Sequence, residues 1–426
     1  MNNLQTIEIF DTVETFKGTT AVEKKDCFFI LSAKELKDAL NRIKPVIKKK
    51  NLNPILDCVK IEVTEGKVQM TASDWENNIT VTMPAETKGQ GQICIPFANF
   101  TGYLQTVLEG NLLFTFDFGN NTLILRRDNS VFKLTGFPAD DFPCLPGENF
   151  AELLKLPANY FVEGINKTVN FTGKNELRPV MSHILIEAEK EVLRYVSTNA
   201  HQLAVYTIKN QSETYEYLQP ENYNLLIHST SAKILKTVLK GETGILRVFT
   251  TATNLKFKYQ NCEFICRNSD LVYPTWRAVV PTELPNTLKV NRKELINVAA
   301  RLVQVTNKTT HRLIFTLNGQ CQVSAEDLEF ANESIEFVKD FSYKGAENFE
   351  IGYSGMFLID CLKAIDSEKV IVLSNASNKA SLILPMSVNR TSDFVLLLMP
   401  VKLNDGEPEA KEEAPEGTPQ EETINE

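Results

Sequence analysis

The sequence lacks any run of 18 or more apolar residues, which argues against a membrane-spanning helix. Its first residues, MNNLQTIEIFDTVETF, include acids and no apolar segment typical of a signal peptide. The eight cysteines are scattered, and the closest pair, Cys262 and Cys266, has no neighbouring histidine, so neither a disulfide framework nor a zinc site is expected. We therefore expect a cytoplasmic protein with reduced, mostly buried thiols and no metal or cofactor.

Catalytic motifs are also missing from the sequence. No GxxxxGK[ST] segment is present, which argues against nucleotide hydrolysis. The four histidines lie in unrelated segments and form no recognisable metal or nucleophile motif: His183, His201, His228 and His311. The chain is therefore expected not to be an enzyme, and a hydrolase with a Cys and a His paired only in space is the enzymatic alternative.

The chain has 426 residues, which favours about three domains, and its 43% apolar and 23% charged residues are typical of a globular protein. Residues 404–426 contain nine acids and one base, Lys411, for a net charge of −8. The whole chain carries −9, so residues 1–403 carry only −1. A tail rich in Glu, Pro and Thr is expected to stay disordered.

Internal repetition is the most informative feature of the sequence. Six segments, spaced roughly 60 to 75 residues apart, have the apolar spacing of amphipathic helices. Ser32 and Glu35 form a capping box at the start of the first. The six are AKELKDALNRI from Ala33, FANFTGYLQTVL from Phe97, NYFVEGINKT from Asn159, SAKILKTVL from Ser231, NRKELINVAARL from Asn291 and SGMFLIDCLKAI from Ser354.

Antiparallel strands are predicted after these helices. KIEVTEGKVQMTASD, ILIEAEKEVLRYVSTNA and LIFTLNGQCQVSAED alternate apolar and polar residues around tight turns such as Glu65-Gly66 and Asn318-Gly319. NLLFTFDFGNNTLILRR and GILRVFTTATNLKFKYQ repeat the pattern after the second and fourth helices. The sequence thus predicts an α+β fold whose unit, one helix plus antiparallel strands, is used twice in each of three domains per chain; the alternative is an accidental recurrence in an ordinary α+β protein.

Positive charge is concentrated in the predicted helices. The window 32–50 carries +5, and windows 229–240 and 291–308 carry +3 each. With 97–109, 158–168 and 354–366 included, the six windows carry +9, so the rest of residues 1–403 carries −10. A shared helical surface would attract phosphate without reading base sequence. The alternative is that Lys and Arg simply favour solvated helix faces.

Eight stretches in order resemble the bacterial β sliding clamp family of DNA polymerase III: KKKNLNPIL, TASDWENNITV, FKLTGFPADDFPCLP, NELRPVMSHILIE, VSTNAHQLAVY, YPTWRAVVP, SGMFLIDCLKAI and MPVKL. The similarity runs from about Phe28 to Leu403. It implies a processivity factor that is a head-to-tail homodimer, a closed ring of three clamp domains per chain with helices around duplex DNA. Expected partners are duplex DNA, DNA polymerase III, a clamp loader and repair proteins, with no membrane. The alternative is a clamp-like scaffold that no longer encircles DNA.

The resemblance also implies site residues. DNA contacts are expected from Arg42, Lys48, Lys49, Lys50, Asn175, Lys233 and Lys236. An apolar site for short partner peptides, between the second and third domains, would comprise Met181, Thr198, His201, Leu203, Pro274, Val279, Phe357, Leu397, Met399 and Pro400. By analogy, the dimer interface would join the first domain near Leu112, Phe114 and Phe116 to the third near Leu302, Val303 and Val305. For the peptide-site residues the alternative is ordinary core packing.

The chain also departs from the family. Ala200 and Gln202 stand where members usually have Gly and Arg, Pro179 and Val180 replace aromatics, and Lys402 replaces Arg. These changes predict altered peptide preference, with Gln202 removing a cation from the rim of the peptide site.

Both ends extend beyond the family's usual limits. Gln5, Ile7, Ile9 and Phe10 loosely imitate a clamp-binding peptide, and the alternatives are an added edge strand or a disordered arm. The acidic tail would repel DNA or recruit a basic partner. The expected divisions are an N-terminal extension, 1–27; clamp domains 28–150, 151–283 and 284–403; and the tail, 404–426.

Overall fold

The structure is a computed structural model of the full chain. It describes residues 27–48, 51–105, 109–127, 130–143, 149–174, 177–210, 214–219, 222–327, 330–386 and 392–403. Residues 1–26 of the N-terminal extension and the acidic tail, with the expectations made for them, lie outside the described residues.

The three predicted domains each contain two helices and two sets of strands. The first domain has β1 (Phe28–Ser32), α2 (Ala33–Ile43), η1 (Lys44–Val46), η2 (Pro54–Asp57), β2 (Cys58–Thr64), β3 (Lys67–Ser73), β4 (Asn77–Pro84), β5 (Glu86–Lys88), β6 (Gly91–Pro96), α3 (Phe97–Leu104), β7 (Asn111–Asp117), β8 (Thr122–Arg127) and β9 (Ser130–Thr135).

The second domain repeats this order. It has β10 (Ala151–Pro157), α4 (Ala158–Thr168), η3 (Val169–Phe171), η4 (Pro179–Ser182), β11 (His183–Ala188), β12 (Val192–Thr198), β13 (Gln202–Lys209), β14 (Glu216–Tyr217), β15 (Tyr223–His228), α5 (Ser229–Val238), β16 (Ile245–Thr250), β17 (Asn254–Tyr259) and β18 (Cys262–Arg267).

The third domain follows after η5 (Trp276–Val279). It has β19 (Asn286–Asn291), α6 (Arg292–Leu302), η6 (Val303–Val305), β20 (Arg312–Leu317), β21 (Cys321–Asp327), β22 (Asn332–Val338), β23 (Phe341–Lys344), β24 (Phe349–Ser354), α7 (Gly355–Ala364), β25 (Lys369–Ser374), β26 (Ser381–Pro385), β27 (Ser392–Leu398) and β28 (Pro400–Val401). All six predicted helices are therefore confirmed, and so is the α+β class.

Local sequence signals explain several element boundaries. The Ser32 hydroxyl accepts a hydrogen bond from the Glu35 amide at 3.2 Å and donates one to the Glu35 carboxylate at 2.8 Å, so α2 begins as predicted. Gly66, in the turn between β2 and β3, has φ of +71°, which glycine adopts without the steric cost that a side chain brings. The predicted hairpin turn is therefore confirmed there.

The chain forms two compact units by contact. Unit 1 comprises the described residues within 1–166, 184–191 and 210–271, and unit 2 those within 167–183, 192–209 and 272–403. Unit 1 contains a five-stranded sheet, in the order β5-β1-β7-β8-β9, and a nine-stranded sheet, in the order β14-β10-β16-β17-β18-β4-β3-β2-β6. In unit 2 the strand orders are β12-β13-β27-β26-β25-β19-β23 and β22-β21-β20-β24-β28.

Consecutive domains are joined by the same kind of strand pairing in each unit. In unit 1, β4 of the first domain pairs with β18 of the second, with Asn77 opposite Cys266. In unit 2, β13 of the second domain pairs with β27 of the third, with Gln202 opposite Leu398. Within the described residues, the first and second domains and the second and third domains are therefore joined by equivalent antiparallel strand pairs.

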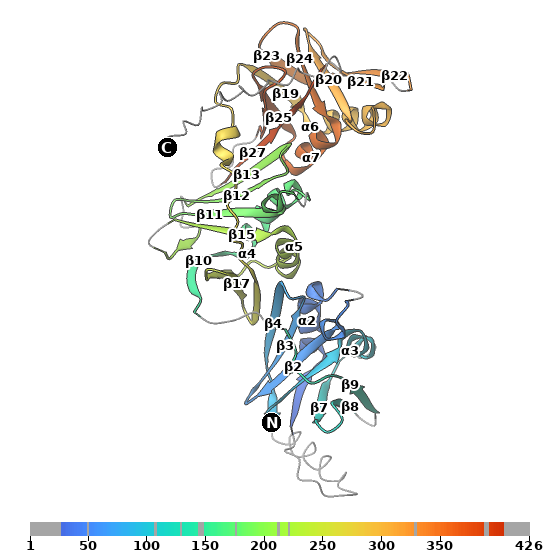
Figure 1. Ribbon diagram of the computed structural model, residues 1–426, viewed down its shortest axis with the longest axis vertical. Helices are drawn as coiled ribbons and strands as arrows, with labels where there is room; N and C mark the ends of the chain where they lie inside the picture. Colours follow the sequence, from blue (N-terminus) through green and yellow to red (C-terminus); the bar gives the residue numbers. More distant parts are fainter. Residues whose placement is uncertain are drawn as a thin grey trace, which may run out of the picture. The chain divides into compact units, whose positions relative to one another are not determined.

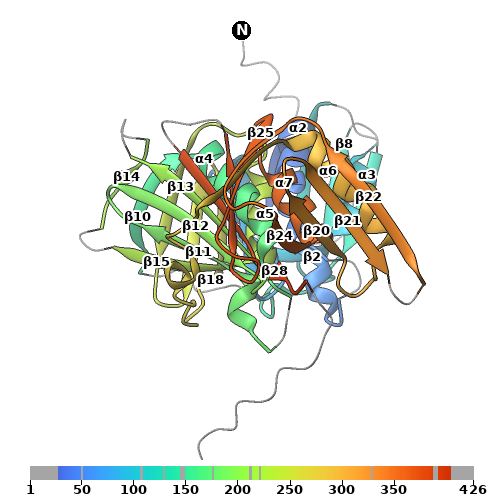
Figure 2. The same cartoon turned by 90° about the horizontal axis from the view of Figure 1, so that it is seen from above.

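Helices pack on the sheets through their apolar stripes. The stripe of α2, which includes Leu36, Leu40 and Ile43, is buried, and α2 packs against β3, β4 and α3. In unit 2, α6 packs beside α7 and against β21 and β22, as Figures 1 and 2 both show. No helix among the described residues is long and apolar enough to span a membrane.

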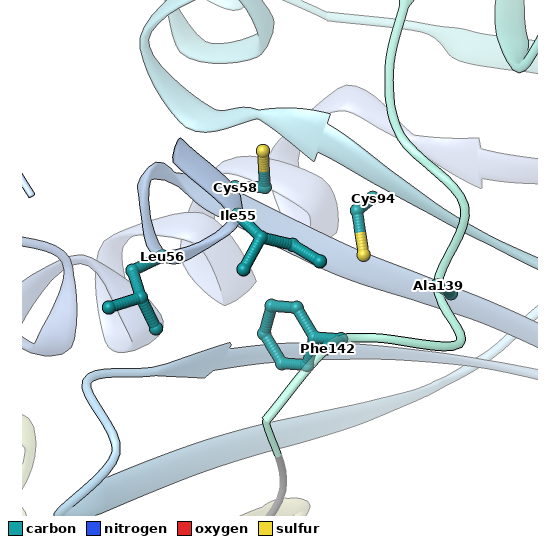
Figure 3. Close-up of a cluster of buried hydrophobic side chains, with 6 residues drawn as sticks. All are labelled: Ile55, Leu56, Cys58, Cys94, Ala139 and Phe142. Atoms are coloured by element: carbon teal, nitrogen blue, oxygen red, sulfur yellow. The ribbon is translucent and has the colours of Figure 1, made fainter. Parts of the chain in front are cut away.

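A smaller apolar cluster anchors the segment that leaves the first domain. Figure 3 shows the Phe142 ring directed towards Ile55 of η2, with Cys94 of β6 and Ala139 nearby. Phe137 and Cys94 exchange two backbone hydrogen bonds, of 2.8 and 3.0 Å, which hold this segment against β6. The segment from Phe137 to Phe142 is thus held against β6 and η2 of the first domain.

Candidate functional sites

The turn between β12 and β13 organises the predicted peptide site, in unit 2. The Asn199 carboxamide oxygen accepts hydrogen bonds from the amides of His201, at 3.0 Å, and Gln202, at 2.8 Å. The Thr198 hydroxyl accepts from the Ala200 amide at 3.2 Å and donates to the Gln202 carbonyl at 2.7 Å. Side chains therefore fix the turn that presents His201.

Ala200 has φ of +75°, a backbone conformation that favours glycine. The replacement of Gly by Ala therefore restricts the backbone at this position, as predicted. The turn still forms because the side chains of Thr198 and Asn199 hydrogen-bond to its backbone.

His201 is the centre of the contacts that bring the predicted residues together. Its imidazole stacks on the ring of Phe357, from the first turn of α7, with 5.4 Å between ring centroids and 18° between planes. The Met399 amide donates to the His201 carbonyl at 2.9 Å, and the Met399 side chain is 40% exposed. The backbone contact thus brings the exposed Met399 to the residue that stacks on Phe357, and these side chain types suit an apolar binding surface.

The other predicted peptide-site residues have different positions. Leu203 and Leu397 lie opposite each other in the β13–β27 ladder and are buried, so they support the surface from beneath. Met181 lies beside Gly173, whose amide donates to the Met181 carbonyl at 2.7 Å, and the Asn199 backbone lies close to the same glycine. Pro274 and Val279 are exposed around η5, and Pro400 begins β28; the contacts described above do not include them.

The rim position expected for residue 202 is wrong. Gln202 is only 2% exposed, and its amide donates to the Phe357 carbonyl at 2.9 Å and the Cys361 thiol at 3.3 Å. Its side-chain oxygen accepts from the Asn199 carboxamide at 2.9 Å. Gln202 therefore ties α7 to the turn and removes nothing from the surface.

Two of the predicted DNA contacts are held by acids in unit 1. Arg42 pairs with Glu242 at 2.9 Å, its guanidinium lies 6.0 Å from the Tyr259 ring centre, and its side chain is 23% exposed. The Tyr259 hydroxyl also donates to Glu242 at 2.7 Å, and that hydrogen bond raises the pKa of Tyr259. Arg42 is thus partly buried and already ion-paired, and its part in DNA binding stays a proposal from the resemblance.

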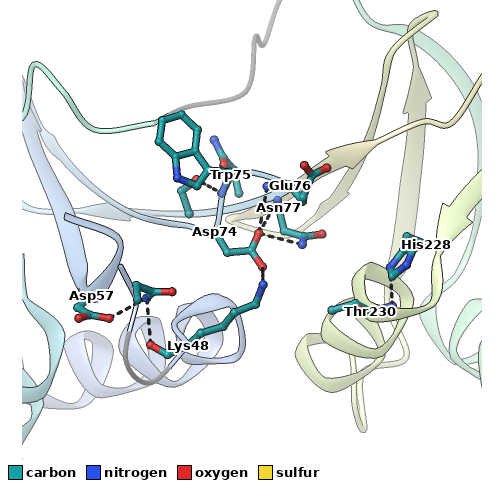
Figure 4. Close-up of polar contacts among 11 residues, drawn as sticks. Lys48, Asp57, Asp74, Trp75, Glu76, Asn77, His228 and Thr230 are labelled. Carbon is teal, nitrogen blue, oxygen red and sulfur yellow. Dashed lines mark hydrogen bonds and ion pairs between the residues drawn. The ribbon is translucent and has the colours of Figure 1, made fainter. Parts of the chain in front are cut away.

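Lys48 is 55% exposed but pairs with the buried Asp74 at 2.8 Å, as Figure 4 shows. Asn51 braces the same loop by donating to the Lys48 carbonyl at 3.1 Å and to Asp57 at 2.7 Å. On α5, Lys233 is exposed and Lys236 is half-buried, while His228 caps the helix by accepting from the Thr230 amide at 3.2 Å. Lys49, Lys50 and Asn175 lie outside the described residues.

The predicted interface residues are mostly internal. Leu112, Phe114 and Phe116 are buried, and their strand β7 lies in the middle of its sheet, so the expected edge is wrong. Leu302 and Val303 are buried too, whereas Val305 is half-buried. The analogy with the family named core residues here: the alternating apolar residues of β7 face the core, and whether a strand lies at an edge depends on strand order.

The strands at the corresponding sheet edges are β9 and β22. Phe132 of β9 stacks on Tyr103 with centroids 4.5 Å apart, and Glu336 of β22 pairs with Arg301 of α6. Their neighbours face outward: Val131 is 54% exposed, Ile335 47% and Phe337 48%. Sequence reasoning missed these residues, although the alternation in NESIEFV was a usable signal.

The cysteine side chains that the structure describes lie in the core. Seven cysteines among the described residues are buried, and none of these seven is in a disulfide: Cys27, Cys58, Cys94, Cys262, Cys266, Cys321 and Cys361. Burial raises the pKa of Cys27 to about 11. Within the described ranges, no three His, Cys, Asp or Glu side chains are grouped so as to hold a metal.

Three repeated domains of paired helices and antiparallel sheets, joined by strand pairing, define the chain as a protein of the DNA-clamp class. Family models for the DNA polymerase III beta subunit match it in succession: the N-terminal domain at residues 27–146, the central domain at 155–275 and the C-terminal domain at 277–402. The chain belongs to the DNA polymerase III beta subunit family.

Similar proteins cover nearly the same span. The beta sliding clamp of Synechocystis sp. is 22% identical over 391 residues, covering 87% of this chain and 97% of that protein. The one from Halalkalibacterium halodurans is 26% identical over 345 residues, covering 78% and 88%.

Solved structures agree on the fold. The DNA polymerase sliding clamp of Bacillus subtilis aligns with a TM-score of 0.79 at 20% identity, covering 89% of this chain and 100% of that one. The DNA polymerase III subunit beta of Pseudomonas aeruginosa aligns with a TM-score of 0.80 at 21% identity, covering 88% and 100%.

Proposed function

We propose that this protein is a DNA polymerase processivity factor, a sliding clamp that encircles duplex DNA as a ring and tethers DNA polymerase III. The observation that carries the proposal is the unbroken succession of three beta subunit domains over residues 27–402. The excess of positive charge in the helical windows supports it, because a basic surface holds phosphates without reading sequence. The protein would act in the cytoplasm, without cofactor or catalysis.

Loose electrostatic contact is sufficient for a topologically held ring. Among the described residues, Lys233 and Lys236 are the DNA contacts that the charge distribution supports best. Lys48 binds a phosphate only if that phosphate displaces Asp74 from its ammonium group. Lys49, Lys50 and Asn175 stay proposals from the resemblance. Each lost phosphate contact should lower the salt dependence of binding by roughly one unit of slope.

The ring requires a head-to-tail homodimer, and β9 and β22 are the edges proposed to close it. Both strands present apolar side chains outward, and exposed Lys133 on β9 complements exposed Glu333 on β22. Pairing β9 with β22 of a partner would join the five-stranded sheet of unit 1 to the five-stranded sheet of the partner's unit 2. It would also cover two exposed strand edges that could otherwise pair with other chains and aggregate.

The apolar surface around His201, Phe357 and Met399 is proposed as the site for short partner peptides from polymerase, clamp loader and repair proteins. A fluorescent peptide of the QLxLF type should bind saturably, and Met399→Ala should weaken binding at least tenfold by removing an exposed anchor. Met386→Ala is the control, since Met386 is similarly exposed but follows the end of β26 opposite to the one that pairs beside Met399. Equal loss in both variants, or no binding by the wild type, would contradict this site.

The decisive experiment for the ring uses DNA topology. The purified protein, loaded onto nicked circular DNA, should remain bound during gel filtration and dissociate once a restriction enzyme linearises the circle. Retention that is the same on circular and linear DNA would contradict encirclement.

A clamp-like scaffold without DNA encirclement is the second candidate. The observation that favours it is that Glu242 and Asp74 pair with Arg42 and Lys48, which reduces the free positive charge of unit 1. A stable monomer that binds the peptide but never stays on circular DNA would establish the scaffold instead of the clamp.

A further inference from the structure

The turn Ser73–Asn78 in unit 1 is a structural copy of the turn that organises the peptide site in unit 2. Asp74 accepts from the amides of Glu76, at 3.2 Å, and Asn77, at 2.8 Å, as Asn199 does from the two corresponding amides. The Ser73 hydroxyl accepts from the Trp75 amide at 3.3 Å, as the Thr198 hydroxyl does from the Ala200 amide. Trp75 therefore occupies the place of Ala200.

The match extends to the backbone and the neighbouring strand. Trp75 has φ of +74° and Ala200 has +75°. Asn77 pairs with Cys266 at the end of β18, as Gln202 pairs with Leu398 at the end of β27. The residues that follow these partners are Arg267, which is exposed, and Met399.

The two turns differ in which element supplies an aromatic ring. In unit 2 the ring comes from Phe357, the third residue of α7, and the turn carries the small Ala200. In unit 1 the third residue of α5 is Ser231, and the turn itself carries the ring of Trp75. A ring thus comes from the helix in unit 2 and from residue 75 of the turn in unit 1.

The backbone conformation of Trp75 leaves its indole exposed to solvent. Its side chain is 53% exposed, and Figure 4 shows the indole directed away from Asp74 and the polar groups bonded to it. Asp74 also pairs with Lys48 at 2.8 Å, which fixes the turn further. A left-handed backbone at a bulky residue is rare and persists only where its surroundings enforce it, and such positions concentrate at functional sites.

We propose that the Trp75 turn is a second docking site in each chain for an extended peptide segment of a partner protein. An apolar side chain of the peptide packs on the indole, since exposed tryptophans dominate binding energy at protein interfaces. Arg267 pairs with a carboxylate beside that side chain, and exposed Glu76 disfavours peptides with more than one acid. The proposal rests on the proposed peptide site in unit 2, because the repeat supplies the argument that this turn presents peptides.

The test uses the full chain with Trp276→Phe, which leaves Trp75 as the single tryptophan. Titration with the peptide Gln-Leu-Asp-Leu-Phe should shift and quench Trp75 emission saturably, with a second binding event per chain by calorimetry. Adding Met399→Ala should remove the first event and leave the Trp75 response at the same midpoint. Loss of the Trp75 response in that variant, or no response at peptide concentrations a hundredfold above those that saturate unit 2, would overturn the proposal.

Trp75→Gly separates docking from folding, because glycine accepts this backbone without strain. That variant should fold and should bind peptide in unit 2 as before. The affinity of the second binding event should fall at least tenfold. Arg267→Met should abolish a preference for Asp over Ser in the middle of the peptide. A Trp75 response to oligothymidylate but not to peptide would assign the turn to single-stranded DNA and overturn the peptide proposal.

Failure of this inference is distinguishable from failure of the proposed function. One peptide per chain, lost with Met399→Ala and unaffected by Trp75→Gly, would leave the unit 2 site standing and eliminate the second.

Discussion

Ala200 shows how one side chain constrains the proposed peptide site. The residue has φ of +75°, where a Cβ atom meets the backbone, and four side-chain hydrogen bonds around Asn199 and Thr198 keep the turn closed. The strain is local, so it belongs to residue 200 and not to the strands on either side.

Ala200→Gly should therefore raise the free energy of unfolding by about 1 kcal/mol, by relief of the left-handed strain. Denaturant titration of unfolding provides the measurement. Ala252→Gly is the matched control, because Ala252 is an exposed turn residue without a positive φ and should gain nothing. A destabilised Ala200→Gly variant would show that the turn is not strained.

Gln202 acts as an internal tie and not as a surface contact. Gln202→Ala should lower the free energy of unfolding by about 1 to 3 kcal/mol, since the Phe357 carbonyl and the Asn199 carboxamide lose their buried partner. It should also weaken peptide binding, because α7 then holds Phe357 less firmly. Gln304→Ala, at an exposed position, should change stability by less than about 0.5 kcal/mol. Equal stability of both variants would contradict the tie.

At the scale of elements, the strand edges decide how copies of the chain can meet. Glu336 and Phe132 face inward on β22 and β9, so the alternating residues Ile335, Phe337 and Val131 must face solvent in the single chain. An exposed apolar edge strand is a liability unless another strand covers it.

Ile335→Lys with Phe337→Lys should convert a dimer into folded monomers, because two ammonium groups would face an apolar edge. Sedimentation velocity measures the change, and a melting curve close to that of the wild type would show that the fold is retained. Val272→Lys, at a 90% exposed position outside both edges, should leave the dimer intact. A dimer that survives both lysines would place the interface elsewhere.

At the scale of the whole molecule, buried thiols link stability to alkaline pH. Burial, with a smaller contribution from Asp57, raises the pKa of Cys58 to about 11, and burial raises that of Cys262 to about 11 as well. In the unfolded chain the pKa of a cysteine thiol is about 8.5, its ordinary value. The stabilising contribution is complete below that pH and is lost as pH rises towards the folded pKa.

Unfolding should therefore become easier between about pH 9 and 11, and Cys58→Ala should flatten that decline relative to the wild type. Denaturant midpoints measured at several pH values in this range test the slope. The seven described thiols should also react slowly with a thiol reagent at pH 8 until denaturant is added. Parallel slopes in the two proteins would mean that Cys58 does not contribute.

The sequence alone determined the repeat, the six helices, the hairpins and the family, since these depend on periodicity and on short-range capping and turn chemistry. Ser32 and Gly66 are examples of signals that act within a few residues. It also identified His201, Phe357 and Met399, but only through the resemblance.

Tertiary structure alone decided which of these residues are accessible and which charges are free. Strand order placed β7 inside its sheet, and contacts distant in sequence buried Gln202 and paired Arg42 with Glu242. It also revealed Trp75 as the counterpart of Ala200. The physical reason is that periodicity shows which face of an element is apolar, whereas edges, ion pairs and exposure depend on neighbours that are far away along the chain.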